Sequence, residues 1–290
     1  MISVITPTYN RAYILPQCYQ SLTRQTSMDF EWIVVDDGSI DKTEQLVLAF
    51  INEKKIDITY IKQENGGKHR AHNRGVLAAK GDLSVCLDSD DQLTEDAIEV
   101  ATKYWIQHSK EDIIGILAKR GSFKTRAPIC SSWPIDLVDS TMFDLSNKYG
   151  FEGDTVLFFR TGLLKNNLFS EFPKEKFLSE ANLYYDLDGY GKMLLLNQVL
   201  YLCEYLPDGL TAKYHKLLCS NPLGTANTYY KGIRSSSNLK EKVKYGLLTN
   251  IYLSLCKDKK DARVNEFDFW VMVTKVPSLV IGKHFLKRFK

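Results

Sequence analysis

The first third of the chain alternates short apolar runs with segments whose apolar residues recur at helical spacing. Four apolar runs predict strands, at residues 2–6, 31–35, 56–61 and 83–87. Three segments between them predict helices, at residues 12–24, 41–52 and 68–80. Strands that alternate with helices of this length are typical of parallel β-α-β units. The pattern therefore predicts an α/β fold with a mostly parallel sheet flanked by helices.

The pattern is weaker after Trp105 and changes character near residue 215. Further strands are predicted at residues 113–118, 155–159 and 199–205, whereas residues 120–150 have no regular period. Lysine-rich helical spacing then follows at residues 231–256, with another helix predicted at 266–273. We therefore expect a first domain over residues 1–215 and a C-terminal helical extension over residues 216–290.

Composition narrows the class of protein. A formal net charge of +3 in 290 residues provides no basic stripe, so we expect no nucleic-acid partner. The six cysteines form no Cys-x-x-Cys pair, which favours free thiols in a reducing compartment. Met1 leads directly into strand-like sequence, so we expect no signal peptide. No apolar stretch approaches the roughly 20 residues of a membrane helix. We expect a cytoplasmic enzyme or binding protein.

Polar side chains follow four strands at the point where each strand ends. The four loops are residues 7–11 (Pro-Thr-Tyr-Asn-Arg), 36–39 (Asp-Asp-Gly-Ser), 65–68 (Asn-Gly-Gly-Lys) and 88–91 (Asp-Ser-Asp-Asp). In a parallel sheet these loops meet at one edge, where open α/β sheets bind ligands. Tyr9 is suited to stacking on a base, Asp37 to accepting hydrogen bonds, and Lys68 to meeting anionic groups. The acidic loop suits a divalent cation bound to a diphosphate, although an acidic turn before the next helix has the same pattern.

The loops, together with residues 5–11, 34–39 and 73–75 (Asn-Arg-Gly), resemble glycosyltransferase family 2 in order and spacing. The resemblance covers residues 1 to about 105. It implies a GT-A fold with a Rossmann-like sheet, a nucleotide-activated sugar as donor, and inversion of the anomeric centre. It further implies a nucleotide-sugar-binding half at residues 1–105 and an acceptor-binding half at residues 106–215.

The same resemblance assigns the residues of the donor site. Pro7, Tyr9 and Asp37 would hold the nucleobase, typically uracil, and Asn65 and Lys68 would border the nucleoside. The remaining positions are Arg11 and Ser89 as donor contacts, Asp88 beside the ribose or the metal, and Asp90 as a ligand of Mn²⁺ or Mg²⁺. The chain departs from many relatives at His72, where they have arginine, and we expect His72 on the helix surface.

Inverting transfer needs a base that takes the proton of the acceptor hydroxyl. The resemblance implies Glu180, in the stretch at residues 172–182, as this base, with Asp154 and Asp186 as alternatives. An acidic residue in the first turn of a helix is the structural alternative for Glu180. We expect Lys231 to be a solvated helix lysine. The turn at residues 208–211 would either fold over the donor or be an ordinary tight turn.

The sequence thus predicts a metal-dependent inverting glycosyltransferase that moves a sugar from a UDP-sugar to a glycan or lipid-linked glycan in cell-surface polysaccharide synthesis. A non-catalytic sugar-nucleotide or glycan-binding module remains open. A nucleotidyltransferase is disfavoured because the loop at residues 7–11 has no glycine. The chain has no G-x-G-x-x-G after its first strand, which excludes the usual nicotinamide site. The basic run at residues 271–290, interrupted by Pro277 and Gly282, would either contact the inner face of a membrane or pack as a plain helix.

Overall fold

The computed structural model describes residues 1–204, 209, 213–236 and 238–287. Contacts divide the chain into two compact units, which we call the first and the second unit. The first unit comprises Met1–Leu168 and Tyr190–Glu204, and the second comprises Phe169–Gly189 and Tyr205–Lys290. The expected domain boundary near residue 215 stays a prediction, and the contacts place residues 169–189 with the C-terminal helices.

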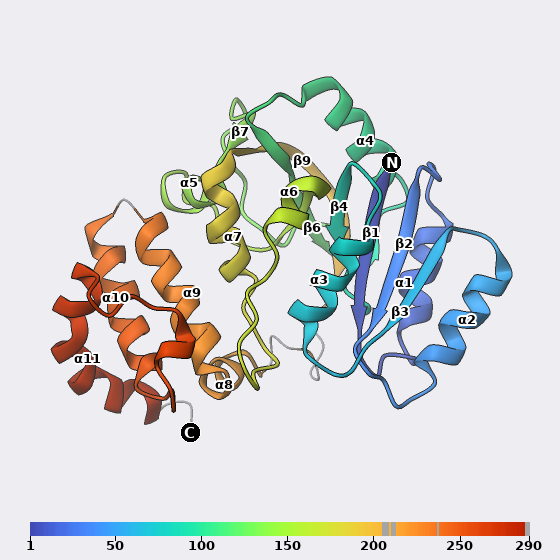
Figure 1. Cartoon of the computed structure of the whole chain (residues 1–290). Coiled ribbons are helices and arrows are strands. Elements are labelled where there is room, and N and C mark those ends of the chain that lie inside the picture. Colours follow the sequence, from blue (N-terminus) through green and yellow to red (C-terminus); the bar gives the residue numbers. More distant parts are fainter. Residues whose placement is uncertain (205–208, 210–212, 237, 288–290) are drawn as a thin grey trace. The chain divides into compact units, whose positions relative to one another are not determined.

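The first unit is built on a sheet whose N-terminal half is parallel (Figure 1). The order of this half is β3-β2-β1-β4, with the strands β1 (Ile2–Thr8), β2 (Phe30–Asp36), β3 (Ile58–Lys62) and β4 (Leu83–Cys86). Each neighbouring pair is parallel, as the alternation of apolar runs and helices predicted. The four strands therefore end at one edge, where the four polar loops follow.

The other half of the sheet is mixed. It continues in the order β8-β6-β9-β5, and β7 pairs with β9, which brings the sheet to nine strands in the described part of the chain. The strands are β5 (Gln92–Leu93), β6 (Ile113–Ser122), β7 (Asp139–Ser140), β8 (Thr155–Arg160) and β9 (Lys192–Cys203). β8 is antiparallel to both β4 and β6, whereas β6 and β9 are parallel. The α/β fold is thus confirmed, and each antiparallel pair includes at least one strand from the C-terminal half of the sheet.

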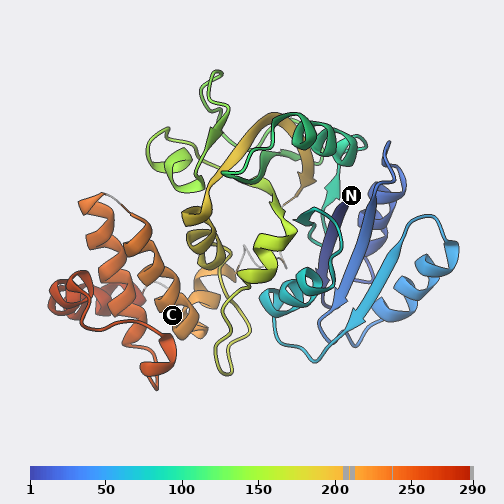
Figure 2. The same cartoon turned by 45° about the horizontal axis from the view of Figure 1, so that its top comes forward.

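Helices cover both faces of the parallel half (Figure 2). The main helices of this unit are α1 (Leu15–Thr23), α2 (Thr43–Glu53), α3 (Lys68–Ala78) and α4 (Ala97–His108), and the short ones are α5 (Met142–Asn147) and α6 (Thr161–Asn166). Successive strand residues point to opposite faces. Val4 belongs to a core shared with α1, α2 and α4, whereas Ile5 meets α3 at Gly75, where an added Cβ would lie 2.3 Å from Ile5 Cγ2. Burial on both faces explains why these strands read as continuous apolar runs.

The second unit is helical. Its helices are α7 (Ala181–Leu187), α8 (Tyr214–Ser220), α9 (Pro222–Ser235), α10 (Leu239–Leu253) and α11 (Phe269–Lys287), with 3-10 turns η1 (Asp188–Tyr190) and η3 (Lys260–Ala262). α10 lies between α9 and α11 (Figure 1). A small core of Leu218, Ala226, Tyr252, Leu253 and Ala262 joins α8, α9, α10 and η3. None of the helices in the described part of the chain is long and apolar enough to cross a membrane.

Among the predicted element boundaries that differ from the structure, three concern the later strands and the C-terminal helices. The helical run predicted at residues 231–256 is two helices, because α9 ends at Ser235 and Asn238 caps α10 by accepting a hydrogen bond from Lys240 N. β9 starts at residue 192 rather than 199. α11 continues through Pro277, although proline cannot donate the helical hydrogen bond at that point.

Candidate active site

The four predicted loops converge at the carboxyl edge of the parallel strands. The Lys68 ammonium, in the first turn of α3, lies 2.6 Å from Asp88 Oδ1 after β4. The Arg11 guanidinium, after β1, lies 3.8 Å from Asp90 Oδ2. All four side chains are partly exposed, at 17–28%. The edge therefore presents two cations and two carboxylates within ion-pair distance and within reach of solvent.

Asp37 organises the loop that leads into α3. Its carboxylate accepts hydrogen bonds from Gly66 N at 2.8 Å, Gly67 N at 2.7 Å, Gln63 Nε2 at 2.7 Å and Asn65 Nδ2 at 3.1 Å. A carboxylate offers about four acceptor positions. The chain itself thus occupies the acceptor capacity of Asp37, which gives this residue a structural role at the predicted donor site. Gln63 was not among the predicted residues, because it lies before the glycine motif.

Two backbone positions explain the glycines of these loops. Gly38 has φ +81°, and a Cβ there would lie 2.9 Å from Asn65 N. Gly67 has φ +99° immediately before α3. A side chain at either position would strain the backbone.

The loops after β1 and β2 are joined by two hydrogen bonds. Asn10 N donates to Ser39 Oγ at 2.8 Å, and Ile40 N donates to Asn10 Oδ1 at 2.9 Å.

The remaining predicted donor residues differ in accessibility. Tyr9 is 46% exposed, so a base has access to its ring. Pro7 and Ser89 are buried. The hydroxyl of Thr8, which is 3% exposed, has no hydrogen-bond partner among the described residues. A buried hydroxyl without a partner at this edge is unusual and favours a polar ligand there.

Tyr201 supports the acidic loop from within the sheet. From β9, its hydroxyl donates to Asp91 Oδ2 at 2.7 Å and accepts from Asp88 N at 3.1 Å. The Arg120 guanidinium lies over the Tyr201 ring, 4.3 Å from its centroid. Neither residue was predicted, because both lie in strands whose sequence shows only ordinary apolar and basic positions. Tyr201 reaches the loop because β9 pairs with β5, which directly follows the loop, and Arg120 reaches Tyr201 because β6 pairs with β9.

Crowding of carboxylates raises their proton affinity. Burial and the neighbouring Asp88 carboxylate raise the pKa of Asp90, although Arg11 lowers it. The pKa of Asp91 is raised by the same two causes, more strongly because Asp91 is more deeply buried. The charges of Arg11 and Lys68 therefore do not fully neutralise the negative charge of the loop at residues 88–91.

The residues at this edge fit a divalent cation in chemistry. Mg²⁺ and Mn²⁺ prefer carboxylate oxygens, and Asp88 and Asp90 provide them on one partly exposed loop. In the described part of the chain, no group of three or more His, Cys, Asp or Glu side chains is arranged to hold a metal. A cation at Asp88 and Asp90 would thus need ligands from the diphosphate or from water.

Glu180 belongs to the second unit, at the start of a helix. It immediately precedes α7, and its backbone carbonyl accepts from Leu183 N at 3.0 Å. Its carboxylate accepts a long hydrogen bond of 3.4 Å from the Tyr184 hydroxyl and makes no capping hydrogen bond to the helix. Its position at the start of α7 is also compatible with the structural alternative, an acidic side chain that interacts with the helix dipole.

A partly buried ion pair joins α7 to α9. Lys231 Nζ pairs with Asp186 and also donates to the backbone oxygen of Asn182 at 3.1 Å and to its Oδ1 at 2.9 Å. Burial lowers the pKa of Lys231 despite its anionic partner. The expectation that Lys231 is solvated was wrong, since its side chain is 17% exposed. Asp186 is committed to this pair, which weakens it as an alternative base.

A second acidic residue of the 172–182 stretch has a structural role. Glu175 is buried, and its two carboxylate oxygens accept from Leu223 N at 2.7 Å and Gly224 N at 2.8 Å at the start of α9. Asn221 Oδ1 accepts in turn from the backbone of Lys176 and Phe177. The stretch at residues 172–182 thus contains a cap for α9, and Glu180 lies C-terminal to the capping residues of this stretch.

Two further expectations concern His72 and the turn at residues 208–211. His72 is buried on α3 rather than on the helix surface, because this turn of α3 packs against the sheet. The turn at residues 208–211 lies outside the described residues, apart from Gly209. Asp154 is exposed in the loop before β8.

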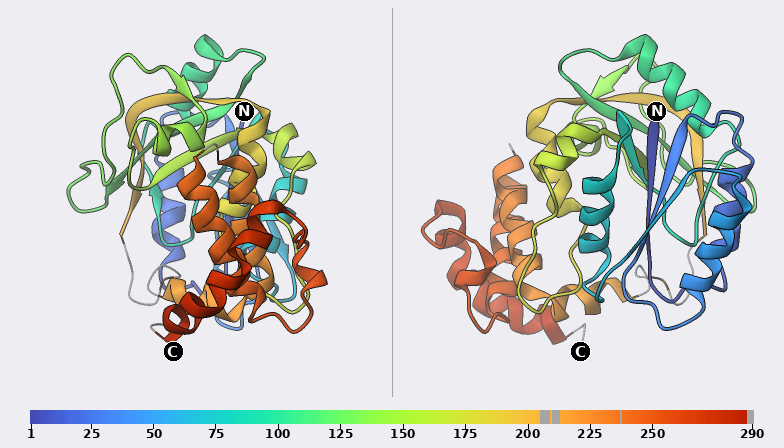
Figure 3. Two further views of the ribbon diagram at one scale, coloured as in Figure 1. Left: turned by 90° about the vertical axis from the view of Figure 1, so that its left-hand side faces the viewer. Right: turned by 45° about the vertical axis from the view of Figure 1, so that its right-hand side comes forward.

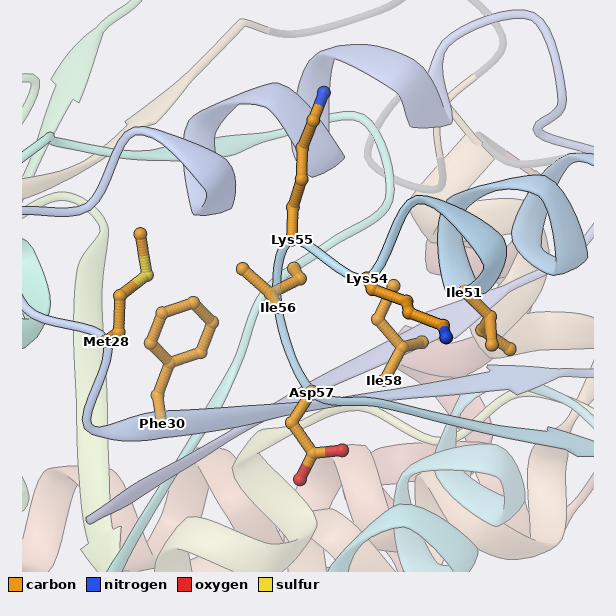
Figure 4. Close-up of a pocket in the computed structure, with 8 residues that line it drawn as sticks. All are labelled: Met28, Phe30, Ile51, Lys54, Lys55, Ile56, Asp57 and Ile58. Carbon is orange, nitrogen blue, oxygen red and sulfur yellow. The ribbon is translucent and has the colours of Figure 1, made fainter.

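A pocket of about 420 Å³ opens at the opposite end of the parallel strands (Figure 4). Its lining comes from the starts of β2 and β3 and from the end of α2, with the residues Met28, Phe30, Ile51, Lys54, Lys55, Ile56, Asp57 and Ile58. The polar loops follow the other ends of these strands. The pocket is therefore separate from the predicted donor site.

Comparison with known proteins identifies a family. The profile of the family Glycosyl transferase family 2 matches residues 3–168, more than half of the chain. Glycosyltransferase GlyG of Streptococcus pneumoniae is 35% identical over 115 residues, which are 39% of this chain and 38% of GlyG. Poly(ribitol-phosphate) β-N-acetylglucosaminyltransferase TarS of Staphylococcus aureus is 27% identical over 191 residues, 63% of this chain and 31% of TarS. The chain therefore spans well under half the length of these relatives.

Solved structures share the fold. The crystal structure of S. aureus TarS residues 1–349 in complex with UDP-GlcNAc has a TM-score of 0.60 and 17% sequence identity, and the similarity covers 99% of this chain and 91% of that one. Mannosyltransferase PcManGT of Pyrobaculum calidifontis, in complex with GDP-Man and Mn²⁺, has a TM-score of 0.56 and 17% identity, with 99% of this chain and 82% of that one covered.

Proposed function

We propose that the chain, which belongs to glycosyl transferase family 2, transfers a sugar from a nucleoside diphosphate donor to a hydroxyl of a glycan or lipid-linked glycan. One observation carries the proposal. The ends of β1 and β4 and the start of α3 bring Arg11, Lys68, Asp88 and Asp90 together beside a loop organised by Asp37. Cations and a carboxylate pair suited to a divalent ion are what a sugar diphosphate requires for binding. The donor half at residues 1–105 and the acceptor half at residues 106–215 belong to this proposal.

We take a UDP-sugar as the donor. Of the two similar structures, TarS has the higher TM-score and holds UDP-GlcNAc, whereas PcManGT holds GDP-Man. The TarS complex supports a UDP-sugar as the donor. The exposed Tyr9 ring provides a surface on which a pyrimidine stacks. Asn65 and Lys68 lie at the entrance of α3, where an α-helix N-terminus favours negative charge.

Asp88 and Asp90 would hold Mn²⁺ or Mg²⁺ together with the diphosphate of the donor. When bound, the cation would stabilise the negative charge that develops on the departing diphosphate. Arg11 and Lys68 contribute to the same end from the protein side, because their charges lie at the same edge. Tyr201 holds the loop in place through Asp91 and the backbone of Asp88.

Glu180 is the proposed base of an inverting, single-displacement reaction. It would take the proton of the acceptor hydroxyl while that oxygen attacks the anomeric carbon. Two contacts support Glu180 over its neighbours in the second unit: Asp186 pairs with Lys231, and Glu175 caps α9.

Calorimetric titration tests the donor site. UDP and GDP are titrated into the protein with Mn²⁺ and then with EDTA, using wild type, Asp90→Asn, and Asp136→Asn as a matched control on an exposed loop. We expect metal-dependent UDP binding that Asp90→Asn weakens at least tenfold and Asp136→Asn leaves unchanged. Folded protein that binds neither nucleotide would contradict the proposal.

Turnover separates the alternatives. Wild-type protein is incubated with a panel of UDP-sugars and acceptors, and release of UDP is measured together with product formation. UDP-sugar binding without transfer to any acceptor would favour the non-catalytic binding module. Release of pyrophosphate from a nucleoside triphosphate in the presence of a sugar phosphate would favour the nucleotidyltransferase.

A further inference from the structure

The C-terminal helix α11 presents small and polar residues to its neighbour α10. The buried positions of α11 are Val271, Thr274, Ser278 and Gly282, spaced three or four residues apart. Gly246 of α10 lies so close that an added Cβ would be 2.7 Å from Thr274 Oγ1. Gly282 is similarly close to Ile251, with 3.1 Å from an added Cβ to Cγ1. Small residues thus allow these two helices to approach closely.

Hydrogen bonds close the same interface. Asn250 of α10 is buried, and its Nδ2 donates to the Val271 carbonyl at 2.8 Å and to Thr274 Oγ1 at 3.0 Å. The Thr274 hydroxyl also donates to the carbonyl of Trp270. Small residues joined by side-chain hydrogen bonds are typical of helix packing in an apolar environment, where burial of apolar groups gives no driving force.

The opposite face of α11 is apolar and exposed. Its exposed apolar residues are Phe269, Met272, Val273, Val276, Leu279 and Val280. They recur every three or four residues and so lie along one side of the helix. Val276 is 72% exposed and Val280 75% exposed. In Figure 3 (left), α11 lies along the near side of the helical group. The polarity is the reverse of a surface helix in water, which buries its apolar side.

The charge of the C-terminal segment indicates which kind of partner covers the exposed apolar face of α11. From Phe269 to Lys290 the sequence holds four lysines and one arginine, and no aspartate or glutamate. A second copy docked on the same face with its α11 parallel to this one would bring two such basic segments together. Anionic lipid headgroups instead complement the segment, at about 1 kcal/mol per basic residue near the surface. An apolar helix face flanked by basic residues is the signature of a helix lying in the membrane interface.

We propose that α11 binds in the plane of an anionic lipid surface, with the Phe269–Val280 side inserted among the acyl chains and α10 behind it. The helix lies on the membrane and does not span it, in keeping with the lack of a spanning helix among the described residues. The inference depends only on contacts within the second unit and is independent of the proposed transfer activity.

Vesicle co-sedimentation tests the inference on the full chain. The probes are vesicles of phosphatidylcholine alone and of phosphatidylcholine with 30% phosphatidylglycerol, chosen as a simple anionic lipid. The variants are Val276→Ser/Val280→Ser on α11 and, as a matched control, Ile106→Ser/Ile135→Ser, which removes two apolar side chains of comparable exposure from the first unit. Circular dichroism and sedimentation velocity establish folding and oligomeric state for each protein.

We expect wild type and the control to bind anionic vesicles at least tenfold more tightly than neutral ones. The α11 variant should lose at least about tenfold in partitioning, because apolar side chains contribute most of the interfacial binding. Equal binding of wild type and the α11 variant would overturn the inference, as would folded wild type that stays in the supernatant with both vesicles. A wild-type dimer that the α11 variant converts to a monomer would assign this face to a second copy instead.

Discussion

Tyr201 on β9 donates a hydrogen bond of 2.7 Å to Asp91 on the acidic loop, across 110 residues of sequence. The same hydroxyl accepts from Asp88 N, so a single side chain ties both ends of the acidic motif to the far half of the sheet. The acidic loop is therefore held from the mixed, C-terminal half of the sheet as well as by its own strand β4.

Tyr201→Phe should uncouple the loop from β9. The change leaves Asp91 and the buried Asp88 amide without their shared partner, so we expect the free energy of unfolding to fall by about 1–3 kcal/mol. Metal-dependent UDP binding should weaken as well, because the carboxylates lose their position. Chemical denaturation and calorimetry measure the two effects. Tyr104→Phe is the matched control, since it removes a hydrogen bond of 3.1 Å to the Leu195 carbonyl, and should leave UDP affinity unchanged.

Asp91 should make the protein less stable as pH rises. Its raised pKa means that the folded protein holds a proton which the unfolded chain releases near pH 4, so stability is highest below that pH and is lost as pH rises through the folded pKa. Asp91→Asn removes this titration and still accepts from Tyr201. Between pH 4 and pH 8 we expect its free energy of unfolding to gain at least about 1 kcal/mol relative to wild type. Parallel pH profiles would show that Asp91 is charged in the folded protein.

Glu180→Gln and Glu175→Gln should separate catalysis from structure. Glu180→Gln removes the proposed base, and we expect kcat to fall about 10²–10⁴-fold with UDP affinity and stability unchanged. Glu175→Gln leaves one of two buried amides of α9 without its carboxylate partner, so we expect a lower melting temperature. Steady-state kinetics and thermal denaturation of both variants provide the comparison. Full turnover by Glu180→Gln would assign the base elsewhere, with Asp154 the next candidate.

Lys231→Met should loosen α7. The change removes an ammonium that joins Asp186 and Asn182, and it leaves Asp186 without its partner, so we expect a loss of about 1–3 kcal/mol in the free energy of unfolding. The double variant Lys231→Met/Asp186→Leu should recover part of the loss, because the unpaired carboxylate is gone. Lys192→Met is the control: its pair with Asp139 is solvent-exposed and should contribute about 0–1 kcal/mol. Equal effects of the two lysine variants would refute the structural role of Lys231.

The sequence predicted the parallel half of the sheet well because its signals are local. Each strand is an apolar run buried on both faces, and each is followed by a helix with its own period. Once the strands are known to be parallel, the meeting of the loops that contain Arg11, Lys68, Asp88 and Asp90 follows from topology alone. The ion pairs confirm that these loops converge.

The remaining parts depend on contacts distant in sequence. Tyr201 is one of several apolar residues in β9, and only strand pairing shows that it meets Asp91. Lys231 resembles any helix lysine until Asp186 is known to face it. His72 lies among polar and basic residues of α3 and is buried only because α3 packs against the sheet. In each case the partner is too distant in sequence for the local periodicity of apolar residues to predict the contact.

The pairing of Lys68 with Asp88 and of Arg11 with Asp90 bears on how the protein would respond to the supply of metal ions in a cell. Arg11 and Lys68 supply part of the counter-charge of the acidic loop, so we expect the loop to fold without an ion from outside. Zinc fingers, by contrast, are unfolded until metal arrives. Under the proposed metal-dependent mechanism, scarcity of Mn²⁺ or Mg²⁺ would leave folded molecules inactive without exposing them to the proteases that remove unfolded chains. Restored supply would then reactivate these molecules without new synthesis.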